Sequence, residues 1–229
     1  MNTNTANKLT AIAQNQQKVY DAGYAQGEKD FWDTIQDFGN RTDYTNYFSA
    51  ASWTDETFKP KHNMTPITGT GMFRFSCIQD LAGILTRQGV TLDFSQDSAP
   101  WYPFSDSKLT RAPAIDFARA KYYNQTFQYC YDLQTVEKLV STADYRWYNT
   151  FKECSALVNL TIEGTIGKDG FNVSWSTKLT HKSLMSIINA LADYHGDGLI
   201  HTVTLGEVNL AKLTDAEKAI ATERGWTLA

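Results

Sequence analysis

The sequence predicts a mixed α/β protein in which short parallel strands stack in consecutive coils between an N-terminal helix and a C-terminal α/β cap. Two observations predict this class. Aromatic, cysteine and aliphatic residues return together at a step of 24 residues in the middle of the chain. One-sided apolar stripes at helical spacing occur near both ends. A fixed return of this length is typical of a solenoid, in which each coil buries its core against the next.

The return is clearest in two segments of the form F-x-x-C-x-x-L, at Phe127–Leu133 and Phe151–Leu157. An aliphatic column at the same step joins Val136, Leu160 and Leu184. We expect these residues to form a buried ladder. Two aromatic columns share the step: Tyr123, Trp147 and Phe171, and Phe127, Phe151 and Trp175.

Upstream copies of the pattern are weaker. Phe104 lies 23 residues before Phe127, and Ser107 takes the cysteine position. The stretch MFRFSCIQDL, at residues 72–81, resembles a divergent first coil. The sequence therefore predicts about 4–5 coils of 23–24 residues over 72–184.

Within a coil, the stretch LVNLTI from Leu157 to Ile162 predicts a short strand whose aliphatic side chains alternate inward. Cys130 and Cys154 then fill small interior positions, which suits a compact apolar thiol. Stacked coils would bring these two cysteines close enough for a disulfide, although a reducing cytosol disfavours one. A redox or metal role is the alternative interpretation.

The N-terminal segment, residues 1–37, carries the apolar helical stripe Leu9, Ile12, Gln16 and Val19, with spacings of 3 and 4 residues. We expect an attachment or oligomerisation helix. The alternative is a helix that folds back to cap the first coil. Residues 38–71, with Pro60 and Pro66, are expected to be an irregular linker or an N-terminal cap.

The C-terminal segment, residues 185–229, is expected to be an α/β cap. A one-sided helix is expected at His181–Tyr194, across the start of this segment, and Leu199–Gly206 alternates like a strand. Thr214 or Asp215 is a candidate helix N-cap, with Gly225 just past the helix end and a last short strand at WTLA.

The spacing F-x-x-C-x-x-L followed by LxxLxI resembles the BspA-type leucine-rich repeats of bacterial surface proteins and of phages that infect gut bacteria. The resemblance covers residues 72–184. The stretch LTAIAQNQQKVYDAGYAQG is similar to the N-termini of accessory structural proteins of tailed phages. In such proteins, the resemblance implies, this segment attaches a receptor-facing or decorative domain to the particle.

Composition and motifs narrow the chemistry. The formal net charge of −4 argues against a nucleic-acid partner. No apolar run is long enough for a membrane span, and the polar start lacks the parts of a signal peptide. Phosphate-loop, nucleophile-elbow and metal-ligand spacings are absent from the sequence. The sequence therefore predicts no enzyme, no cofactor and no metal.

The candidate binding residues flank the aromatic columns. Tyr122, Tyr145, Arg146 and Tyr148 are of the types that dominate recognition surfaces, and we expect them to face outward. Stacking on a sugar or on a partner protein would both suit these rings. The alternative is that they merely cover the flank of the solenoid.

Two functions follow as expectations. In the first, the chain is a virion structural protein of the tail, baseplate, neck or head, assembled in the host cytoplasm. It would be a homo-oligomer, with a trimer favoured, held to other virion proteins by its N-terminal helix. Its target would be a host surface glycan or protein. In the second, it is an adhesin-type interaction module at the bacterial cell surface.

Overall fold

The computed structural model describes residues 41–49, 53–97, 100–119 and 125–229. All of them belong to one compact unit that runs from Asn40 to Ala229. Two sets of predicted residues lie outside the described ranges: the N-terminal stripe Leu9, Ile12, Gln16 and Val19, and, in the middle of the chain, Tyr122 and Tyr123.

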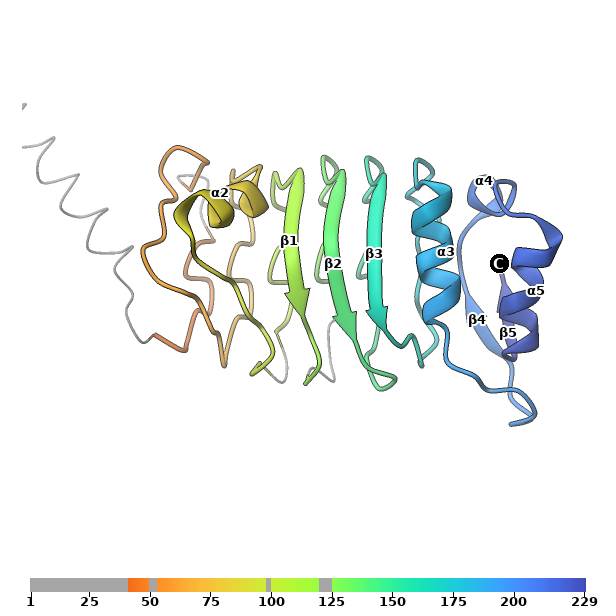
Figure 1. The fold of residues 1–229 in the computed structure, drawn as a ribbon. Coiled ribbons are helices and arrows are strands. Elements are labelled where there is room, and N and C mark those ends of the chain that lie inside the picture. Colours follow the sequence, from red (N-terminus) through yellow and green to blue (C-terminus); the bar gives the residue numbers. More distant parts are fainter. Residues whose placement is uncertain (1–40, 50–52, 98–99, 120–124) are drawn as a thin grey trace, which may run out of the picture. The chain divides into compact units, whose positions relative to one another are not determined.

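Parallel strands form two small sheets. Strands β1 (Arg111–Asp116), β2 (Thr135–Ser141) and β3 (Asn159–Gly164) lie side by side in chain order (Figure 1). Strands β4 (His201–Val203) and β5 (Trp226–Leu228) form a second parallel pair. This arrangement confirms the mixed α/β class and the parallel strands, and β4 and β5 confirm the two strands predicted in the C-terminal segment.

The register of the larger sheet follows the sequence step. Arg111 lies opposite Thr135, and Thr135 lies opposite Asn159, so the strands are offset by 24 residues where they begin. Between β2 and β3 the register then shifts, so that Leu139 lies opposite Ile162. Val136 is paired with Leu160, and both side chains are buried. The predicted aliphatic ladder is therefore an interior contact.

A row of four buried phenylalanine rings runs beside the sheet. We call Phe73, Phe104, Phe127 and Phe151 the phenylalanine row. Their consecutive ring centroids are 5.6, 5.3 and 5.8 Å apart, and each pair is stacked. Burying and stacking large rings gives this row much of its stabilising contact area.

The two predicted interior cysteines lie against this row. The Cys130 thiol donates a hydrogen bond to the carbonyl of Phe104 at 3.0 Å, and the Cys154 thiol donates one to the carbonyl of Phe127 at 3.1 Å. Both cysteines are free and buried. Their burial and hydrogen bonds agree with the interior role expected from the sequence.

One predicted column member is wrong. Trp175 is 46% exposed and does not continue the column of Phe127 and Phe151. The buried residues here are Val173, Ser176 and Leu179, with the same spacing as Phe151, Cys154 and Leu157. The Ser176 hydroxyl donates to the carbonyl of Cys154 at 3.0 Å. The Cys154–Ser176 offset is 22 residues, because the chain returns by a shorter path here, so a strict 24-residue step overshoots.

Four described helices accompany the sheets. Helix α2 (Leu81–Gln88) begins after Asp80, whose side chain accepts from the Gly83 amide. It ends at Gly89, which has a φ of 64° and so suits the left-handed C-cap. This helix begins at the end of the stretch 72–81 that resembles a divergent first coil, and the sequence analysis predicted no helix here.

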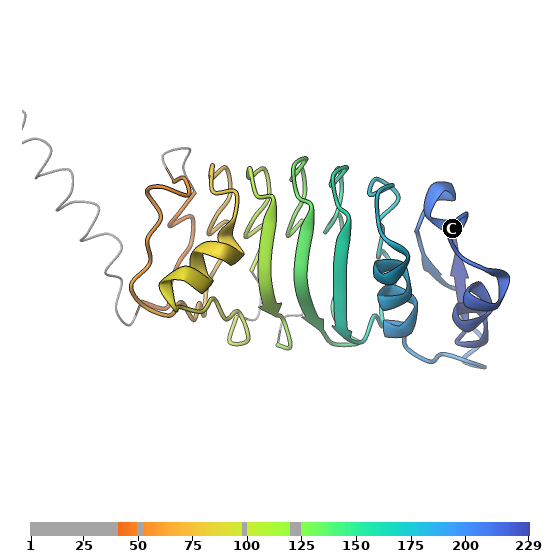
Figure 2. The same cartoon turned by 45° about the horizontal axis from the view of Figure 1, so that its top comes forward.

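The remaining helices lie toward the C-terminus: α3 (His181–Ala190), α4 (Glu207–Leu210) and α5 (Asp215–Glu223). Helix α3 packs beside β3 and also contacts α5 (Figure 2). Thr214, rather than Asp215, is the N-cap of α5, and it forms a capping box with Glu217. The predicted boundary between 184 and 185 is wrong, because it falls inside α3.

The segment before residue 72 packs as part of the same unit. Phe48 stacks on Phe73 with centroids 5.1 Å apart, and single parallel bridges join Thr54 to Cys77 and Met64 to Leu92. Of the two roles expected for 38–71, these contacts favour the cap. The large buried side chains of this segment are Tyr44, Phe48, Trp53, Phe58 and Met64.

Candidate functional site

The predicted binding residues do not all face outward. Arg146 and Tyr148 are exposed, with Tyr148 at 63%. Tyr145 is fully buried, so its predicted outward role is wrong. A turn bonded from the Tyr145 amide to the Thr142 carbonyl brings the ring onto Phe117, 5.9 Å away between centroids. The same burial raises the pKa of the Tyr145 hydroxyl.

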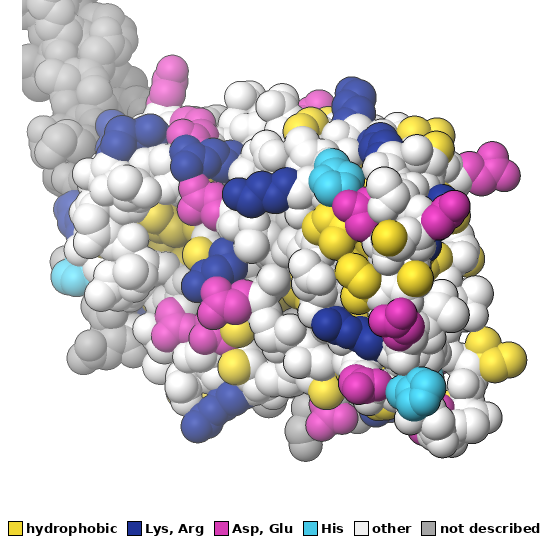
Figure 3. Space-filling view, turned by 45° about the vertical axis from the view of Figure 1, so that its right-hand side comes forward, with side chains coloured by type: hydrophobic (Ala, Val, Ile, Leu, Met, Phe, Trp, Pro, Cys, Tyr) yellow, Lys and Arg dark blue, Asp and Glu magenta, His cyan; other side chains and the backbone are white. Residues whose placement is uncertain are grey.

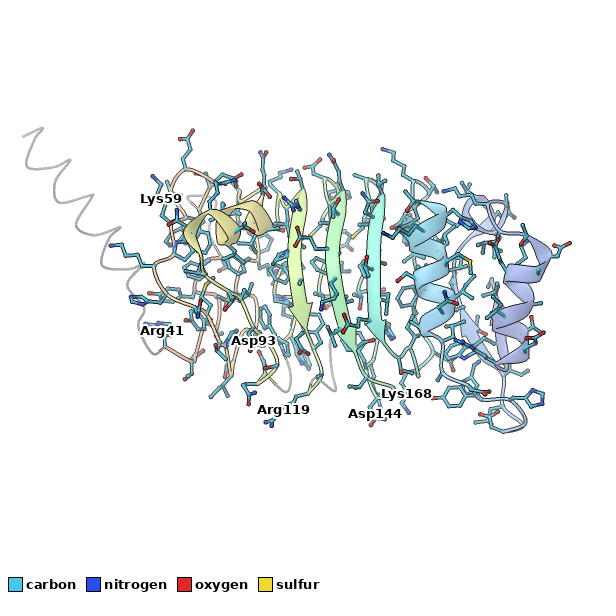
Figure 4. All side chains as sticks on the ribbon, in the orientation of Figure 1. Arg41, Lys59, Asp93, Arg119, Asp144 and Lys168 are labelled. Atoms are coloured by element: carbon cyan, nitrogen blue, oxygen red, sulfur yellow. The ribbon has the colours of Figure 1, made fainter. Side chains whose placement is uncertain are left out.

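Charged residues close to Tyr145 and Arg146 form an ion pair. Asp144 and Lys168, in the loops that follow β2 and β3, form an ion pair at 3.6 Å. Figure 4 shows them together at the same end of the sheet as Arg119, which follows β1. This end of the sheet therefore presents mixed charge rather than one sign.

The exposed aromatic side chains recur at similar positions relative to the buried phenylalanines. Among the described residues, each lies within four positions of a member of the phenylalanine row or of Val173. We call the surface that they mark the turn face. Its exposed rings are Phe75, Trp101, Tyr131, Tyr148 and Trp175.

The best-connected group on the turn face surrounds Arg74. Its guanidinium carbon is 4.4 Å from the centre of the Phe75 ring and 5.2 Å from that of Tyr102. Its Nε donates to the Asp106 carboxylate at 3.3 Å. Trp101 lies against Tyr102 in an edge-to-face contact. We call Arg74, Phe75, Trp101, Tyr102 and Asp106 the Arg74 cluster.

A second, smaller group follows on the next turns. The rings of Tyr129 and Tyr131 are 6.1 Å apart, and the Lys152 ammonium is 5.4 Å from the centre of Tyr129. The Asp106 amide donates to the Gln128 carbonyl at 2.8 Å, which places the two groups on adjacent turns. We call Tyr129, Tyr131 and Lys152 the Tyr129 cluster.

The backbone holds several of these rings in an uncommon conformation. Phe75, Tyr102 and Tyr129 have φ values of 60°, 43° and 60°. A side chain with a Cβ pays about 1–2 kcal/mol in the left-handed region. The turns require this geometry two residues before and two residues after the phenylalanines, as also at Asn149 and Glu153 around Phe151.

Sequence reasoning missed the Arg74 cluster because Arg74 and Asp106 are 32 residues apart. The available signal was the aromatic density of FRF and WYPF, at residues 73–75 and 101–104. Nothing in that density indicated that the two stretches lie on neighbouring turns.

The outward side chains of β1–β3 are mostly engaged with one another. Arg111 pairs with Glu137 and lies 3.7 Å from Asp80, while Lys138 pairs with Glu163 at 2.9 Å. The face drawn in Figure 3 likewise carries Lys and Arg beside Asp and Glu, without a large area of one sign.

Contacts of His201 near the C-terminus have a structural role. The His201 ring stacks on Tyr194, and its Nε2 lies 2.9 Å from the Asp197 carboxylate. This hydrogen bond, with one from the Leu199 amide, lowers the pKa of Asp197. The contacts close the loop between residues 194 and 201 on itself.

The described residues also form a hollow of about 410 Å³ lined by Thr54, Asp55, Glu56, Cys77 and Gln79. The carboxylate of Asp55 already accepts from the Gln79 amide at 2.6 Å. Over the described ranges, no three His, Cys, Asp or Glu side chains come together as possible metal ligands. No helix among them is long and apolar enough to cross a membrane.

Comparison of the chain with protein-family models, curated proteins and solved structures found no significant match.

Proposed function

We propose that residues 72–184 form a short leucine-rich-repeat-type solenoid of about 4–5 coils between an N-terminal and a C-terminal cap, and that the protein is a non-enzymatic binding protein. The 24-residue offset at the start of strands β1–β3 and the stacking within the phenylalanine row support the solenoid. The resemblance to BspA-type repeats remains the sequence argument for the family. A solenoid is a scaffold, so its function depends on the surface that it displays.

The turn face is the surface that we propose for binding. A globular protein normally spreads single exposed apolar residues over its surface. Here the exposed ring of Phe75 lies against Arg74, and the exposed ring of Tyr131 lies beside Tyr129, over which Lys152 is placed. Aromatic residues with a polar partner are the usual anchors of recognition.

The setting that we propose is a phage virion, in which the turn face meets a host surface glycan or protein. The N-terminal segment supports this setting through its similarity to accessory structural proteins of tailed phages. That segment would hold the protein, as a homo-oligomer, to other virion proteins.

An attachment assay tests the binding proposal. Full-length protein is fluorescently labelled and mixed with cells of gut bacteria, and the bound fraction is measured for Arg146→Ala and Tyr148→Ala. Both residues are exposed, so each variant should lose less than about 1 kcal/mol of stability while attachment weakens. Thr161→Ala, on an outward position of β3, is the matched control and should attach normally. Unchanged attachment in both variants would contradict the binding role predicted for Arg146 and Tyr148.

A truncation tests the attachment segment. Removing residues 1–39 should leave the melting temperature nearly unchanged, because stacked coils depend mainly on their neighbours. The shortened protein should be monomeric by light scattering and absent from purified particles. A large drop in melting temperature would mean that the segment caps the solenoid, and surface display without particles would favour the adhesin alternative.

A further inference from the structure

We infer that the Arg74 cluster is a binding subsite for an uncharged carbohydrate. The inference deepens the proposed function, on which it rests, by naming the ligand class and the residues that would hold it. These residues differ from Arg146 and Tyr148, on which the sequence had placed the binding surface.

The first argument is that an aromatic ring of the cluster is both exposed to solvent and held in an unfavourable backbone conformation. Phe75 is 52% exposed and has a φ of 60°, so about half of its surface faces solvent and its backbone is strained. Glycine holds the left-handed position at Gly71, and asparagine holds another at Asn149. Both types bear that conformation at less cost than phenylalanine. A ring kept there despite both costs indicates a role for the ring itself.

The second argument is the chemistry of the cluster. The flat faces of Phe75 and Trp101 offer dispersion contacts to the C–H face of a sugar ring. Arg74 and Asp106 add a fork of donors and a pair of acceptors within reach of neighbouring hydroxyls. The Ser105 hydroxyl donates to Asp106 at 2.9 Å, which helps to fix the carboxylate. The cluster thus offers apolar ring faces for the C–H face of a sugar and paired polar groups for its hydroxyls.

The third argument is charge. The Arg74 guanidinium is paired with Asp106 at 3.3 Å, and on the next turn Lys108 pairs with Asp132 at 3.7 Å. An anionic ligand would have to displace these carboxylates or approach them closely. Charge balance therefore favours a neutral ligand over an acidic one.

The neighbouring Tyr129 cluster extends the site. It lies on the adjacent turn and repeats the combination of rings with a cation. Two such subsites side by side suit an oligosaccharide better than a single sugar, because linked units gain from binding together.

The test compares two glycine substitutions at equivalent left-handed positions. Phe75→Gly removes the ring from the cluster, while Glu153→Gly makes the same backbone change two residues after Phe151, outside the cluster. Glycine is unstrained at both positions, so both variants should fold. Calorimetry would measure the binding of glucose, mannose, galactose and N-acetylglucosamine oligomers, with heparin and polysialic acid as anionic probes.

We expect a neutral oligomer to bind the full-length protein, Phe75→Gly to weaken this binding at least about tenfold, and Glu153→Gly to leave it unchanged. Asp106→Asn, which also suits a left-handed backbone, should weaken binding too. Binding of no neutral oligomer at millimolar concentration, binding of anionic probes alone, or equal binding by Phe75→Gly would overturn the inference.

The same variants separate this inference from the proposed function. If protease treatment of the cells abolishes attachment and no oligomer binds, the target is a protein, and only the carbohydrate inference fails. If a neutral oligomer binds as expected but attachment ignores every turn-face variant, the subsite stands and the host-binding function fails.

Discussion

The hydroxyl of Ser183 serves as the hydrogen-bond partner of the outer edge of β3. Its Oγ accepts from the Leu160 amide at 2.9 Å and donates to the Val158 carbonyl at 3.2 Å. One helical turn further along α3, the Ser186 hydroxyl accepts from the Ile162 amide at 2.9 Å. Two serines on one face of α3 thus occupy the positions that a further strand would take. This satisfies an edge that would otherwise offer unpaired groups to another chain.

Removing these hydroxyls should destabilise the protein. Ser183→Ala leaves a buried amide without its partner, so we expect a loss of about 1–3 kcal/mol by denaturant unfolding. Ser186→Ala should cost less, since Ser186 is only half-buried. Hydrogen exchange should accelerate at the Leu160 and Ile162 amides. Ser155→Ala, at an exposed serine, is the control, and equal stability of Ser183→Ala and that control would refute the edge assignment.

The aliphatic ladder should behave as core. Leu160 is buried and paired with Val136, so Leu160→Ala should lose about 2–5 kcal/mol. Thr161 points the other way on the same strand, and Thr161→Ala should change stability by less than about 0.5 kcal/mol. A loss below that value for Leu160→Ala would mean that the register of β3 is wrong.

The three cysteines should react differently with a thiol reagent. Burial raises the pKa of Cys130 to about 12 and also raises that of Cys154, so neither forms a thiolate at neutral pH. Cys77 is half-buried and lines the hollow beside Asp55. We expect one thiol to react in the native protein and three after denaturation. Rapid native labelling of Cys130 or Cys154, identified by peptide mapping, would contradict their interior position.

Arg224 should stabilise the end of α3. Its Nη1 lies 2.9 Å from the carbonyls of Asn189 and Leu191 and 3.3 Å from that of Ile188. Hydrogen bonds from a cation to a helix C-terminus are among the stronger ones, so Arg224→Met should cost about 1–3 kcal/mol. Lys182→Met, at an exposed position of the same helix, should be nearly neutral. Similar melting temperatures for the two variants would exclude the cap.

At turn positions with a left-handed backbone, a change from glycine to alanine should lower the stability of the protein, whereas a change to glycine should not. Gly71 has a φ of 62°, and a Cβ there would lie 2.2 Å from the Asn46 side-chain oxygen. Gly71→Ala should therefore lose at least about 1–2 kcal/mol. Glu153→Gly should be neutral or slightly stabilising, because strain relief offsets the greater freedom of the unfolded chain. A destabilised Glu153→Gly together with a tolerated Gly71→Ala would reject this turn geometry.

Features that repeat or lie close together along the chain could be predicted. The F-x-x-C-x-x-L spacing located Phe127, Phe151 and both interior cysteines, and the C-terminal cap residues located α5. The same reliance on spacing failed where the path changed length, at Trp175. It also missed α2, which lies between the end of the stretch 72–81 and the next predicted turn at Phe104.

The sequence by itself determined the parallel α/β class, the aliphatic ladder and the position of α5, because these depend on periodicity and on neighbouring residues. Tertiary structure decided which rings are exposed and which polar groups meet. Tyr145 and Tyr148 are of one type and three positions apart, yet a turn buries the first and leaves the second in solvent. Arg74 and Asp106 meet across 32 residues. The physical reason is that such contacts depend on the full path of the chain between two turns, which no local pattern specifies.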